Sequence, residues 1–367
     1  VWKCRALAPC LFAQTKCPKP RHPPLISWFW RKALIFRLLW GRILSFETGL
    51  DVDEVIRENI ENAYRLRLKI VNNDSYRLVN AEGDYLPGLI VDVYNDIVVV
   101  QSTSLGFDKH LDIVVNVLKE LLNPRMIYLR NDQRSRREVN LPIYRRVVYG
   151  TPPPRTIIHE GNVKFYVDVE KGQKTGFFLD QRENRMYIER LVWRGAKVLD
   201  LYSYTGGFAL HCLHAGASAA IMVDESSYAT WEAHNNVRLN HFEDKAEIIQ
   251  CKVEDFLRHF RSRTFDIVIA DPPALIPNLQ SKSKGLKAYF NLYKSVLERV
   301  SEGGLAILSS CSYFLTSNEM IDIVNRASLN VGRNVKVVRI AGCSVDHVSR
   351  PQDDFLRYLK VIYAIVE

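Results

Sequence analysis

The sequence contains no long uncharged apolar run. A membrane-spanning helix needs roughly 20 consecutive apolar residues, whereas the most apolar N-terminal run, residues 33–40, is short and contains Arg37. We therefore predict no transmembrane segment. With 47% hydrophobic and 25% charged residues among 367, the composition instead predicts a soluble globular protein of two or three domains.

Closely spaced cysteine pairs are also absent, since no C-x-x-C sequence occurs. The seven cysteines are an odd number and are scattered along the chain, at Cys4, Cys10, Cys17, Cys212, Cys251, Cys311 and Cys343. This usage is typical of a reducing cytoplasm, which is the compartment we expect. The spacing of the first three with His22 matches no common zinc module, so no metal site is expected.

Acidic residues are missing from residues 1–46, which carry nine Lys or Arg. The 50 basic residues of the chain less these nine equal the 41 acidic ones, so the net charge of +9 belongs entirely to this stretch. A positive charge confined in this way predicts contacts with nucleic-acid phosphates. An organelle transit peptide is the alternative, although the cysteines, tryptophans and prolines of the stretch fit it poorly.

Residues 1–48 form a basic segment without a clear period of two or 3.6, so no fold is assigned to it. Residues 49–70 follow as a predicted linking helix, in which one face carries Val55, Ile56, Ile60, Ala63 and Leu66. Five short β-rich runs and an amphipathic helix near residues 108–122 then predict a small α+β domain. The runs are residues 76–80, 89–94, 97–103, 126–130 and 163–169.

An arginine-rich stretch, residues 130–146, lies between the last two of these runs. Its arginines are Arg130, Arg134, Arg136, Arg137, Arg145 and Arg146. A phosphate-contacting edge and a solvated surface loop explain this composition equally well, because Asp132 and Glu138 dilute the charge. Both interpretations stay open.

From residue 196 onward, apolar strand-like runs alternate with helical patterns, as in βαβ units with a parallel sheet. Seven runs are predicted to be strands, at residues 196–202, 219–224, 246–251, 265–271, 304–312, 335–341 and 359–367. Since crossovers between parallel strands are right-handed, these elements predict a doubly wound, Rossmann-like α/β sheet.

Ligands of such sheets bind beyond the carboxyl ends of the strands, so polar residues at those ends are candidates. Asp200 closes the first strand, and Gly206 and Gly207 follow, where glycine lets a ligand approach the backbone and the helix start offers N–H groups. Asp224 ends the second strand, where a carboxylate commonly accepts hydrogen bonds from ribose hydroxyls. No G-x-G-x-x-G fingerprint is present. The two carboxylates nevertheless favour a nucleoside-binding site over the alternative that they end their strands without a shared role.

Two further strand ends carry binding or reactive groups. Asp271 is followed by two prolines, which form a stiff turn that would hold the carboxylate in the cleft and offer a wall to a nucleobase. Cys311 lies among serines at the end of the fifth strand. Most cysteines are small buried side chains, as fits Cys212, Cys251 and Cys343. Cys311 instead shares the edge of the sheet with the carboxylates, which is typical of a reactive thiolate.

Together these motifs resemble the bacterial 23S rRNA large-subunit methyltransferase I family, whose members methylate carbon 5 of cytosine. The segments that carry the resemblance are residues 75–94, 177–182, 198–208, 271–273, 310–312, 346–347 and 358–360.

The resemblance implies an N-terminal PUA domain, of which residues 1–48 would be a truncated remnant, and a central β-β-α-β-β domain over residues 71–170. It also implies a class I methyltransferase domain over residues 171–367 that uses S-adenosylmethionine. The residues implied to bind this cofactor are Phe178, Asp180, Gln181, Arg182, Asp200, Tyr202, Ser203, Thr205, Gly206, Gly207, Asp224, Glu225, Ser226, Asn240, Val253, Asp271 and Pro272. Cys311 is implied as the catalytic nucleophile, with Asp271 as the second catalytic residue.

Three positions depart from the pattern of this family. Lys252 stands where an acidic residue usually contacts adenine, so that a backbone N–H near Val253 would serve instead. Ala274 replaces a lysine after the Asp-Pro-Pro motif, and Phe290 replaces the lysine of a Tyr-Lys pair. The two lost positive charges bear on RNA positioning or on catalysis.

The expected function is methylation of cytosine carbon 5 in RNA, with 23S rRNA as the expected substrate. The Cys311 thiolate would add to carbon 6, so that carbon 5 can attack the methyl group. Two alternatives stay open: a methyltransferase acting on a nitrogen of RNA or on a small molecule, and a non-catalytic binder of RNA or cofactor. A homodimer is compatible with each of them.

Overall fold

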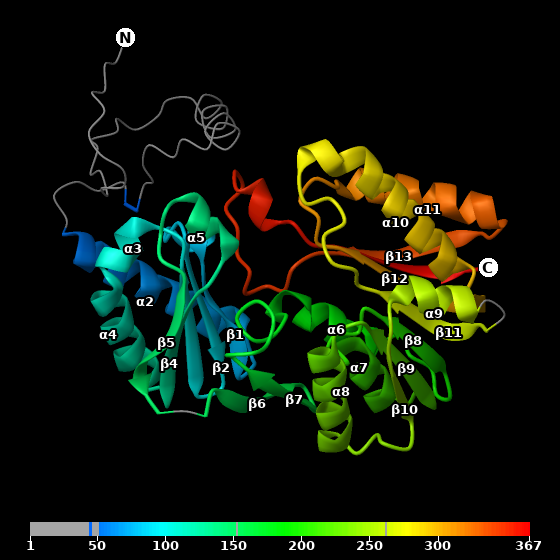
Figure 1. The fold of residues 1–367 in the computed structure, drawn as a ribbon, viewed down its shortest axis with the longest axis horizontal. Coiled ribbons are helices and arrows are strands. Elements are labelled where there is room, and N and C mark those ends of the chain that lie inside the picture. The colour runs from blue at the N-terminus through cyan, green and yellow to red at the C-terminus, as the bar shows by residue number, and fades with distance from the viewer. Residues whose placement is uncertain (1–43, 46–50, 152, 261–262) are drawn as a thin grey trace, which may run out of the picture. The chain divides into compact units, whose positions relative to one another are not determined.

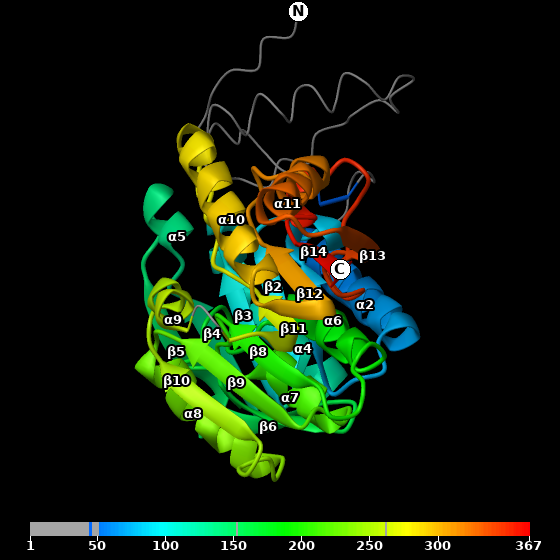
Figure 2. The same cartoon turned by 90° about the vertical axis from the view of Figure 1, so that its right-hand side faces the viewer.

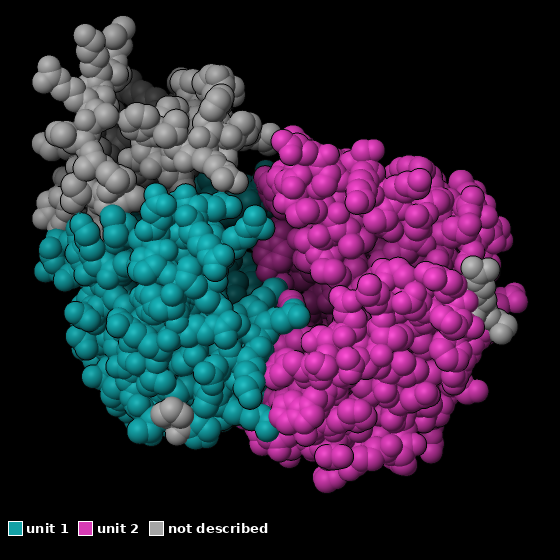
Figure 3. All heavy atoms as spheres, viewed as in Figure 1, with its two compact units in different colours: residues 1–156, 167–177, 345–356 teal, residues 157–166, 178–344, 357–367 magenta. Residues whose placement is uncertain are grey.

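The computed structural model describes residues 44–45, 51–151, 153–260 and 263–367 (Figure 1). The predictions for the basic segment, which are the PUA remnant, the phosphate contacts and the rejected zinc site, therefore fall almost wholly outside the described residues. The chain divides into two compact units, coloured separately in Figure 3. Unit 1 comprises Val1–Thr156, Val167–Phe177 and Val345–Leu356, and unit 2 comprises Ile157–Tyr166, Phe178–Ser344 and Arg357–Glu367.

Unit 1 is built on a five-stranded sheet with the order β1-β2-β3-β4-β5. Its strands are β1 (Ser75–Asn80), β2 (Leu89–Tyr94), β3 (Ile97–Ser102), β4 (Met126–Asn131) and β5 (Tyr144–Gly150). Because β3 and β4 run parallel, the chain crosses between them through α3 (Leu105–Lys109) and α4 (Leu111–Leu122). The other neighbouring strands pair antiparallel. Every residue of the central strand β3 is buried, as its run of Ile and Val predicts.

Helix α2 (Val52–Ile70) covers this sheet and contacts β1 and α4. Four of the five predicted apolar positions are buried, but Leu66 is 38% exposed. The buried position is the neighbouring Arg67, which is 1% exposed. An apolar periodicity alone could not show this, because it counts arginine as a solvent-facing residue.

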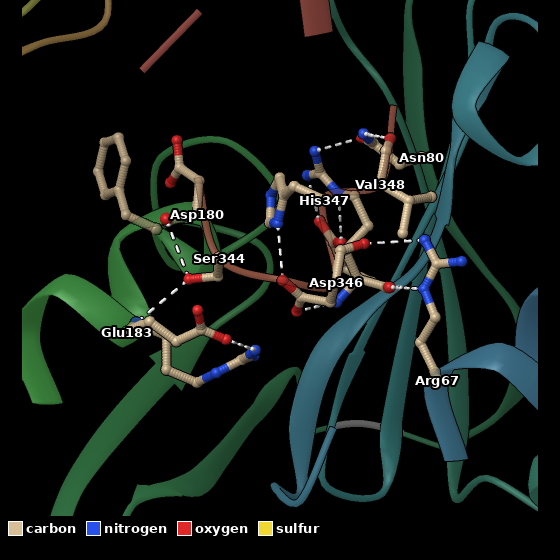
Figure 4. Close-up of polar contacts among 12 residues, drawn as sticks. Arg67, Asn80, Asp180, Glu183, Ser344, Asp346, His347 and Val348 are labelled. Atoms are coloured by element: carbon tan, nitrogen blue, oxygen red, sulfur yellow. Dashed lines mark hydrogen bonds and ion pairs between the residues drawn. The ribbon is translucent and has the colours of Figure 1, made fainter. Parts of the chain in front are cut away.

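Arg67 forms a buried ion pair in unit 1. Its guanidinium donates to both carboxylate oxygens of Asp84 and, at 2.8 Å, to the backbone carbonyl of Asp346. Asn80 binds the same distant stretch, since its amide donates to the carbonyl of Val348 at 2.8 Å (Figure 4). These side chains therefore attach residues 345–356 to unit 1, far from their place in the sequence.

Two elements differ from what the sequence patterns predicted. The arginine-rich stretch contains a short helix, α5 (Arg134–Glu138), and the edge strand β5, where no strand was predicted. In addition, β7 (Val163–Asp168) pairs with β6 (Arg155–Glu160) in a separate two-stranded sheet instead of joining the central one. No residue of β5 is fully buried, so it lacks the clear alternation on which strand prediction depends.

Unit 2 contains the predicted Rossmann-like α/β sheet of seven strands, with the order β10-β9-β8-β11-β12-β14-β13. The strands are β8 (Lys197–Leu201), β9 (Ala219–Asp224), β10 (Ala246–Gln250), β11 (Phe265–Ala270), β12 (Val300–Ser310), β13 (Val335–Ala341) and β14 (Lys360–Val366). The predicted runs are confirmed, except that β12 begins at Val300 and ends before Cys311.

Helices cover both faces of this sheet (Figures 1 and 2). One face packs against α9 (Val253–His259), α10 (Lys282–Leu297) and α11 (Ser317–Val331). The other face carries α6 (Arg182–Ile188), α7 (Gly207–His214) and α8 (Ser227–Leu239). In the described part of the chain, no helix is long and apolar enough to cross a membrane.

We expect Arg67→Met to lower the free energy of unfolding by about 3–5 kcal/mol, because it leaves the Asp84 carboxylate buried without its cation. Urea unfolding followed by circular dichroism measures this loss. The matched control is Arg65→Met on the same helix, because the Arg65 side chain is 61% exposed and pairs with Glu61 at 3.8 Å. Its effect should stay within about 0.5 kcal/mol. Equal losses in the two variants would contradict the prediction.

Candidate active site

Four parallel strands of unit 2, β9, β8, β11 and β12, end at one edge of the sheet. Their last residues lie side by side in register, because Leu201 pairs with Val223 and Ala270 pairs with both Leu201 and Leu308. The predicted site residues that close or follow these strands are therefore brought to one edge: Asp200, Asp224, Asp271 and Cys311. The strand order reverses between β8 and β11, which is where such sheets bind ligands.

The loop after β8 is a tight turn with an unusual backbone. Tyr202 and Tyr204 adopt left-handed conformations, with φ of 60° and 49°, which non-glycine residues rarely do. Gly206 follows with φ of 85°, and a Cβ there would lie 2.9 Å from Sδ of Met222. The backbone conformation therefore favours glycine, and a larger residue would also need the Met222 side chain to shift. Ser203 fixes the loop by donating its N–H to the carbonyl of Val223 in β9 at 3.1 Å.

Asp200 lies under this loop and is 1% exposed. Its Oδ2 accepts the N–H of Ala209 at 3.0 Å, whereas its buried Oδ1 has no hydrogen-bond partner among the described residues. Burial raises the pKa of Asp200 to about 8, and the nearby carboxylates of Asp271 and Asp224 add to the effect. The buried hydroxyl of Thr205 likewise finds no described partner.

Asp224 is half-buried at the end of β9, and both of its carboxylate oxygens accept backbone N–H groups. Oδ2 accepts from Tyr204 and Oδ1 from Ser226, each at 2.9 Å. Each oxygen can accept a second hydrogen bond, so the carboxylate can also hold a pair of hydroxyl groups. Ser226 caps the start of α8, and the predicted Glu225 is exposed between the two residues.

Gln181 connects the predicted segment 178–182 to this edge. Its Nε2 donates to Oδ1 of Asp271 at 3.0 Å and to the hydroxyl of Ser309 at 3.2 Å. The ring of Phe178 meets the ring of Tyr204 edge-on, with centroids 5.2 Å apart. Gln181 and Phe178 thus contact the turn after β11 and the loop after β8 respectively.

Asp180 and Arg182, on either side of Gln181, are buried. Oδ2 of Asp180 accepts from the hydroxyl of Tyr358 at 2.8 Å. The carbonyl oxygen of Asp180 accepts from the hydroxyl of Ser344 at 3.0 Å (Figure 4). Arg182 lies 3.8 Å from the carboxylate of Glu183. These bonds hold the segment in place, and they suit a supporting position better than direct contact with a ligand.

Arg185 is a buried cation beneath the loop, and sequence reasoning did not identify it. It donates to both carboxylate oxygens of Glu160, at 2.8 and 2.6 Å, and to the carbonyl of Phe178 at 2.9 Å. Burial opposes ionisation of Glu160, but Arg185 and His211 outweigh it and lower the pKa of Glu160 to about 2. A Cβ on Gly207 would lie 2.6 Å from Cδ of Arg185, so glycine allows this close approach.

The third predicted part of the site lies at the start of α9. Val253 is buried in the first turn of this helix, where N–H groups lack acceptors within the helix. The next residue, Glu254, accepts from the hydroxyl of Tyr202 at 3.0 Å. Glu254 was not predicted, although it places a carboxylate beside the loop two residues after Lys252.

Asn240 is the predicted cofactor residue that the structure places elsewhere. It caps the C-terminus of α8, whose 13 residues put it about 20 Å from the N-terminal cap of that helix. Its amide also bonds at both atoms to the backbone of Lys164, since Nδ2 donates to the carbonyl at 2.7 Å and Oδ1 accepts the N–H at 2.9 Å. Asn240 therefore fastens β7 to α8, and we leave it out of the cofactor site.

Cys311 occupies a turn whose neighbours are buried while the thiol itself is half-exposed. Its Sγ lies 3.9 Å from the carbonyl oxygen of Pro272, to which the thiol donates. The hydroxyl of Tyr289 bonds to the hydroxyls of both Ser310 and Ser312, each at 2.8 Å. The turn is thereby fixed on each side of the thiol, next to the Asp-Pro-Pro motif.

Comparisons with known proteins agree with this geometry. Residues 146–313 match the family of S-adenosylmethionine-dependent methyltransferases. A ribosomal RNA large subunit methyltransferase of Methanocaldococcus jannaschii is 36% identical over 321 residues, which are 86% of this chain and 81% of the relative. Ribosomal RNA large subunit methyltransferase I of Escherichia coli O139:H28 is 34% identical over 315 residues, or 84% and 79%.

Solved structures show the same fold. A methyltransferase crystallised with SAH superposes with a TM-score of 0.76 at 24% identity, over 88% of this chain and 84% of the other. An S-adenosylmethionine-dependent methyltransferase from Streptococcus mutans gives the same TM-score and coverage at 23% identity.

The residues at the edge of the sheet fit S-adenosylmethionine. Oδ1 of Asp200 and the hydroxyl of Thr205 are buried polar atoms that need a partner, and a ligand with ammonium and carboxylate groups supplies one. Asp224 presents acceptors for the ribose, and the first turn of α9 presents N–H groups for the adenine. The loop glycines leave room for the ligand to approach the backbone.

We expect Asp224→Ala to weaken S-adenosylmethionine binding by on the order of 1–3 kcal/mol, because the ribose hydroxyls lose their acceptor. Isothermal titration calorimetry measures the change. Asp266→Ala is the matched control, since Asp266 also accepts a backbone N–H, from Lys197 at 2.8 Å, but lies at the opposite end of β11. An unchanged dissociation constant for Asp224→Ala would remove Asp224 from the site.

A second prediction concerns pH. Asp200 is protonated in the free protein at pH 7, because its pKa is raised to about 8, and a bound cation favours its ionised form. Binding should then release a proton, so affinity should increase from pH 6 to pH 8, by at most about tenfold per pH unit. Asp200→Asn should lack this part of the dependence. Identical pH profiles for the two proteins would refute the linkage.

Proposed function

This chain belongs to the ribosomal RNA large subunit methyltransferase I family of S-adenosylmethionine-dependent enzymes, and from that premise we propose that it methylates carbon 5 of a cytosine in ribosomal RNA through a covalent bond to Cys311. The relatives' names support the RNA substrate. The observation that carries the chemistry is the position of Cys311, whose half-exposed thiol lies 3.9 Å from the Pro272 carbonyl at the edge that holds the cofactor residues.

The proposed reaction begins at the thiol. Carbon 5 of cytosine is a poor nucleophile, so the ring needs activation. The Cys311 thiolate adds to carbon 6, and the electron pair of the carbon 5–carbon 6 double bond moves into the ring. Negative charge develops on the ring, and Asp271 in its protonated form donates its proton to nitrogen 3 of the base, which neutralises that charge. S-adenosylmethionine supplies the methyl group that carbon 5 takes up. A water molecule then takes the carbon 5 proton, and the electron pair of that bond restores the double bond and expels the thiolate.

The surroundings of both residues suit these roles. Gln181 donates to Oδ1 of Asp271 at 3.0 Å, which holds the carboxyl group at the edge where the base is proposed to bind. The hydroxyl of Tyr293 donates to the carbonyl of Ser309 at 2.9 Å, and Tyr289 holds the serines beside the thiol. Rigid support of this kind keeps a nucleophile close to its reacting position.

The arginine-rich stretch contributes to RNA binding in this proposal. The structure separates its members, because Arg136 pairs with Asp108 at 2.6 Å and Arg145 pairs with Asp132 at 2.5 Å. Exposed guanidinium groups remain on unit 1 at Arg134, Arg137 and Arg146. These are the positions suited to phosphate contacts. The homodimer and the cytoplasmic location stay predictions of the sequence.

We expect Cys311→Ala to abolish methyl transfer and to leave the affinity for S-adenosylmethionine nearly unchanged, because the thiol acts in the reacting state and not on the bound cofactor. Transfer of labelled methyl groups to ribosomal RNA, with mass spectrometry of the nucleosides, measures the first effect, and calorimetry measures the second.

Cys212→Ala is the matched control, because Cys212 is buried in α7, where burial raises the pKa of its thiol well above its ordinary value. It should retain transfer. The wild-type protein should also form a covalent complex with RNA containing 5-fluorocytosine. Retained cytosine methylation by Cys311→Ala would favour methylation of a nitrogen instead.

A further inference from the structure

Lys360 is a second charged group at the candidate nucleophile. It is the first residue of β14, where its backbone lies opposite Ser310 in the antiparallel pairing with β12. Its Nζ donates to the carbonyl of Ser312 at 2.8 Å. The side chain therefore reaches from the residue before Cys311 to the residue after it, and it is only 7% exposed.

The electrostatic surroundings of Lys360 are unfavourable for a structural ammonium group. Burial lowers the pKa of Lys360 to about 8, and thiolates at Cys311 and Cys343 are the groups that most oppose this effect. The carboxylate that also acts on it, Glu319, is already engaged, because it pairs with Lys282 at 2.6 Å and accepts the Thr316 N–H at 2.8 Å. An apolar side chain in this position would cost less free energy of burial.

We propose that Lys360 is a positioning residue for the reaction: its ammonium group fixes the turn that carries Cys311 and stabilises the thiolate before it adds to carbon 6 and after it leaves. This inference rests on the proposed function of Cys311. The thiol loses its proton to water before the addition, and Lys360 transfers no proton in the reaction. No bond to Lys360 forms or breaks.

Among the described groups that contact this turn, the two tyrosines supply no positive charge. Burial raises the pKa values of Tyr289 and Tyr293, which therefore stay neutral at working pH. Asp271 carries negative charge when ionised, and Cys343 is neutral or negative. Glu319 and Lys282 form an ion pair whose two charges cancel. Lys360 is a buried described cation beside this turn, and its charge favours ionisation of Cys311.

The rate of alkylation of Cys311 by iodoacetamide, followed by mass spectrometry from pH 5 to pH 10 in the full chain, tests this proposal. Only the thiolate reacts, so the midpoint of the rate profile reports its ionisation. Lys360→Met should move the midpoint upward by about one pH unit or more, whereas Lys360→Arg should keep it near the wild-type position. The half-exposed Cys251, which directly precedes the N-terminal cap of α9, is the internal reference and should not shift.

A purely structural role makes a different prediction. If Lys360 only holds the turn, Lys360→Met should lower the melting temperature and leave the midpoint where it is. The proposal expects a shifted midpoint whatever the change in melting temperature, because Lys360→Met removes both a buried charge and the hydrogen bond to the Ser312 carbonyl. It also expects kcat for methylation to fall at least tenfold with KM for the cofactor unchanged.

An unshifted midpoint in Lys360→Met would overturn the proposal. If Lys360→Met does not fold, Lys360→Arg provides the test, because this variant keeps the positive charge. A midpoint raised by about one pH unit in Lys360→Arg would also overturn the proposal. The alkylation midpoint decides the role of Lys360, and methylation by Cys311→Ala decides the proposed function, so the two failures can be told apart.

Discussion

The adjacency of β8 and β11 is the constraint on which the candidate site depends. β8 pairs in parallel with both β9 and β11, yet the chain proceeds from β8 to β9 and from β11 to β12, which lie in opposite directions. The loop after Asp200 and the turn after Asp271 consequently leave the sheet edge on opposite sides, with α7 on one face and α10 on the other. Two carboxylates thus meet at an edge that no crossover between these two strands covers.

Such a cluster of acidic groups needs support from beneath. The pKa of Asp200 is raised by burial and by its acidic neighbours. Asp200 is therefore protonated at pH 7 in the free protein, and the cluster carries one negative charge fewer. Arg185 stays ionised under the loop. Burial opposes its charge, but the ion pair with Glu160 outweighs this effect and raises the pKa of Arg185. The strained turns at Tyr202 and Tyr204 cost on the order of 1–3 kcal/mol each. They persist because surrounding bonds fix them, which prepares the loop for a ligand.

The sequence predicted best what repeats along the chain. Strands buried on both faces read as unbroken apolar runs, which is why β8, β9 and β11 were found nearly to the residue. It failed where a single polar residue replaces an apolar one. Arg67 is buried while Leu66 is exposed, and nothing in the helix period distinguishes the two. Pairs such as Arg185 with Glu160 are likewise invisible, because a charge looks solvated until its distant partner is known.

The direction of β14 explains why the search at strand ends did not find Tyr358 and Lys360. A search at the carboxyl ends of strands finds residues on parallel strands, but β14 runs antiparallel to β12, so its amino end lies at the ligand edge. Tyr358 and Lys360, which precede and open this strand, therefore reach Asp180 and Ser312, although they stand near the end of the chain. In a sheet with one reversed strand, the rule for finding site residues must be reversed for that strand as well. The same pairing gives Cys311 a cation that no motif around it contains.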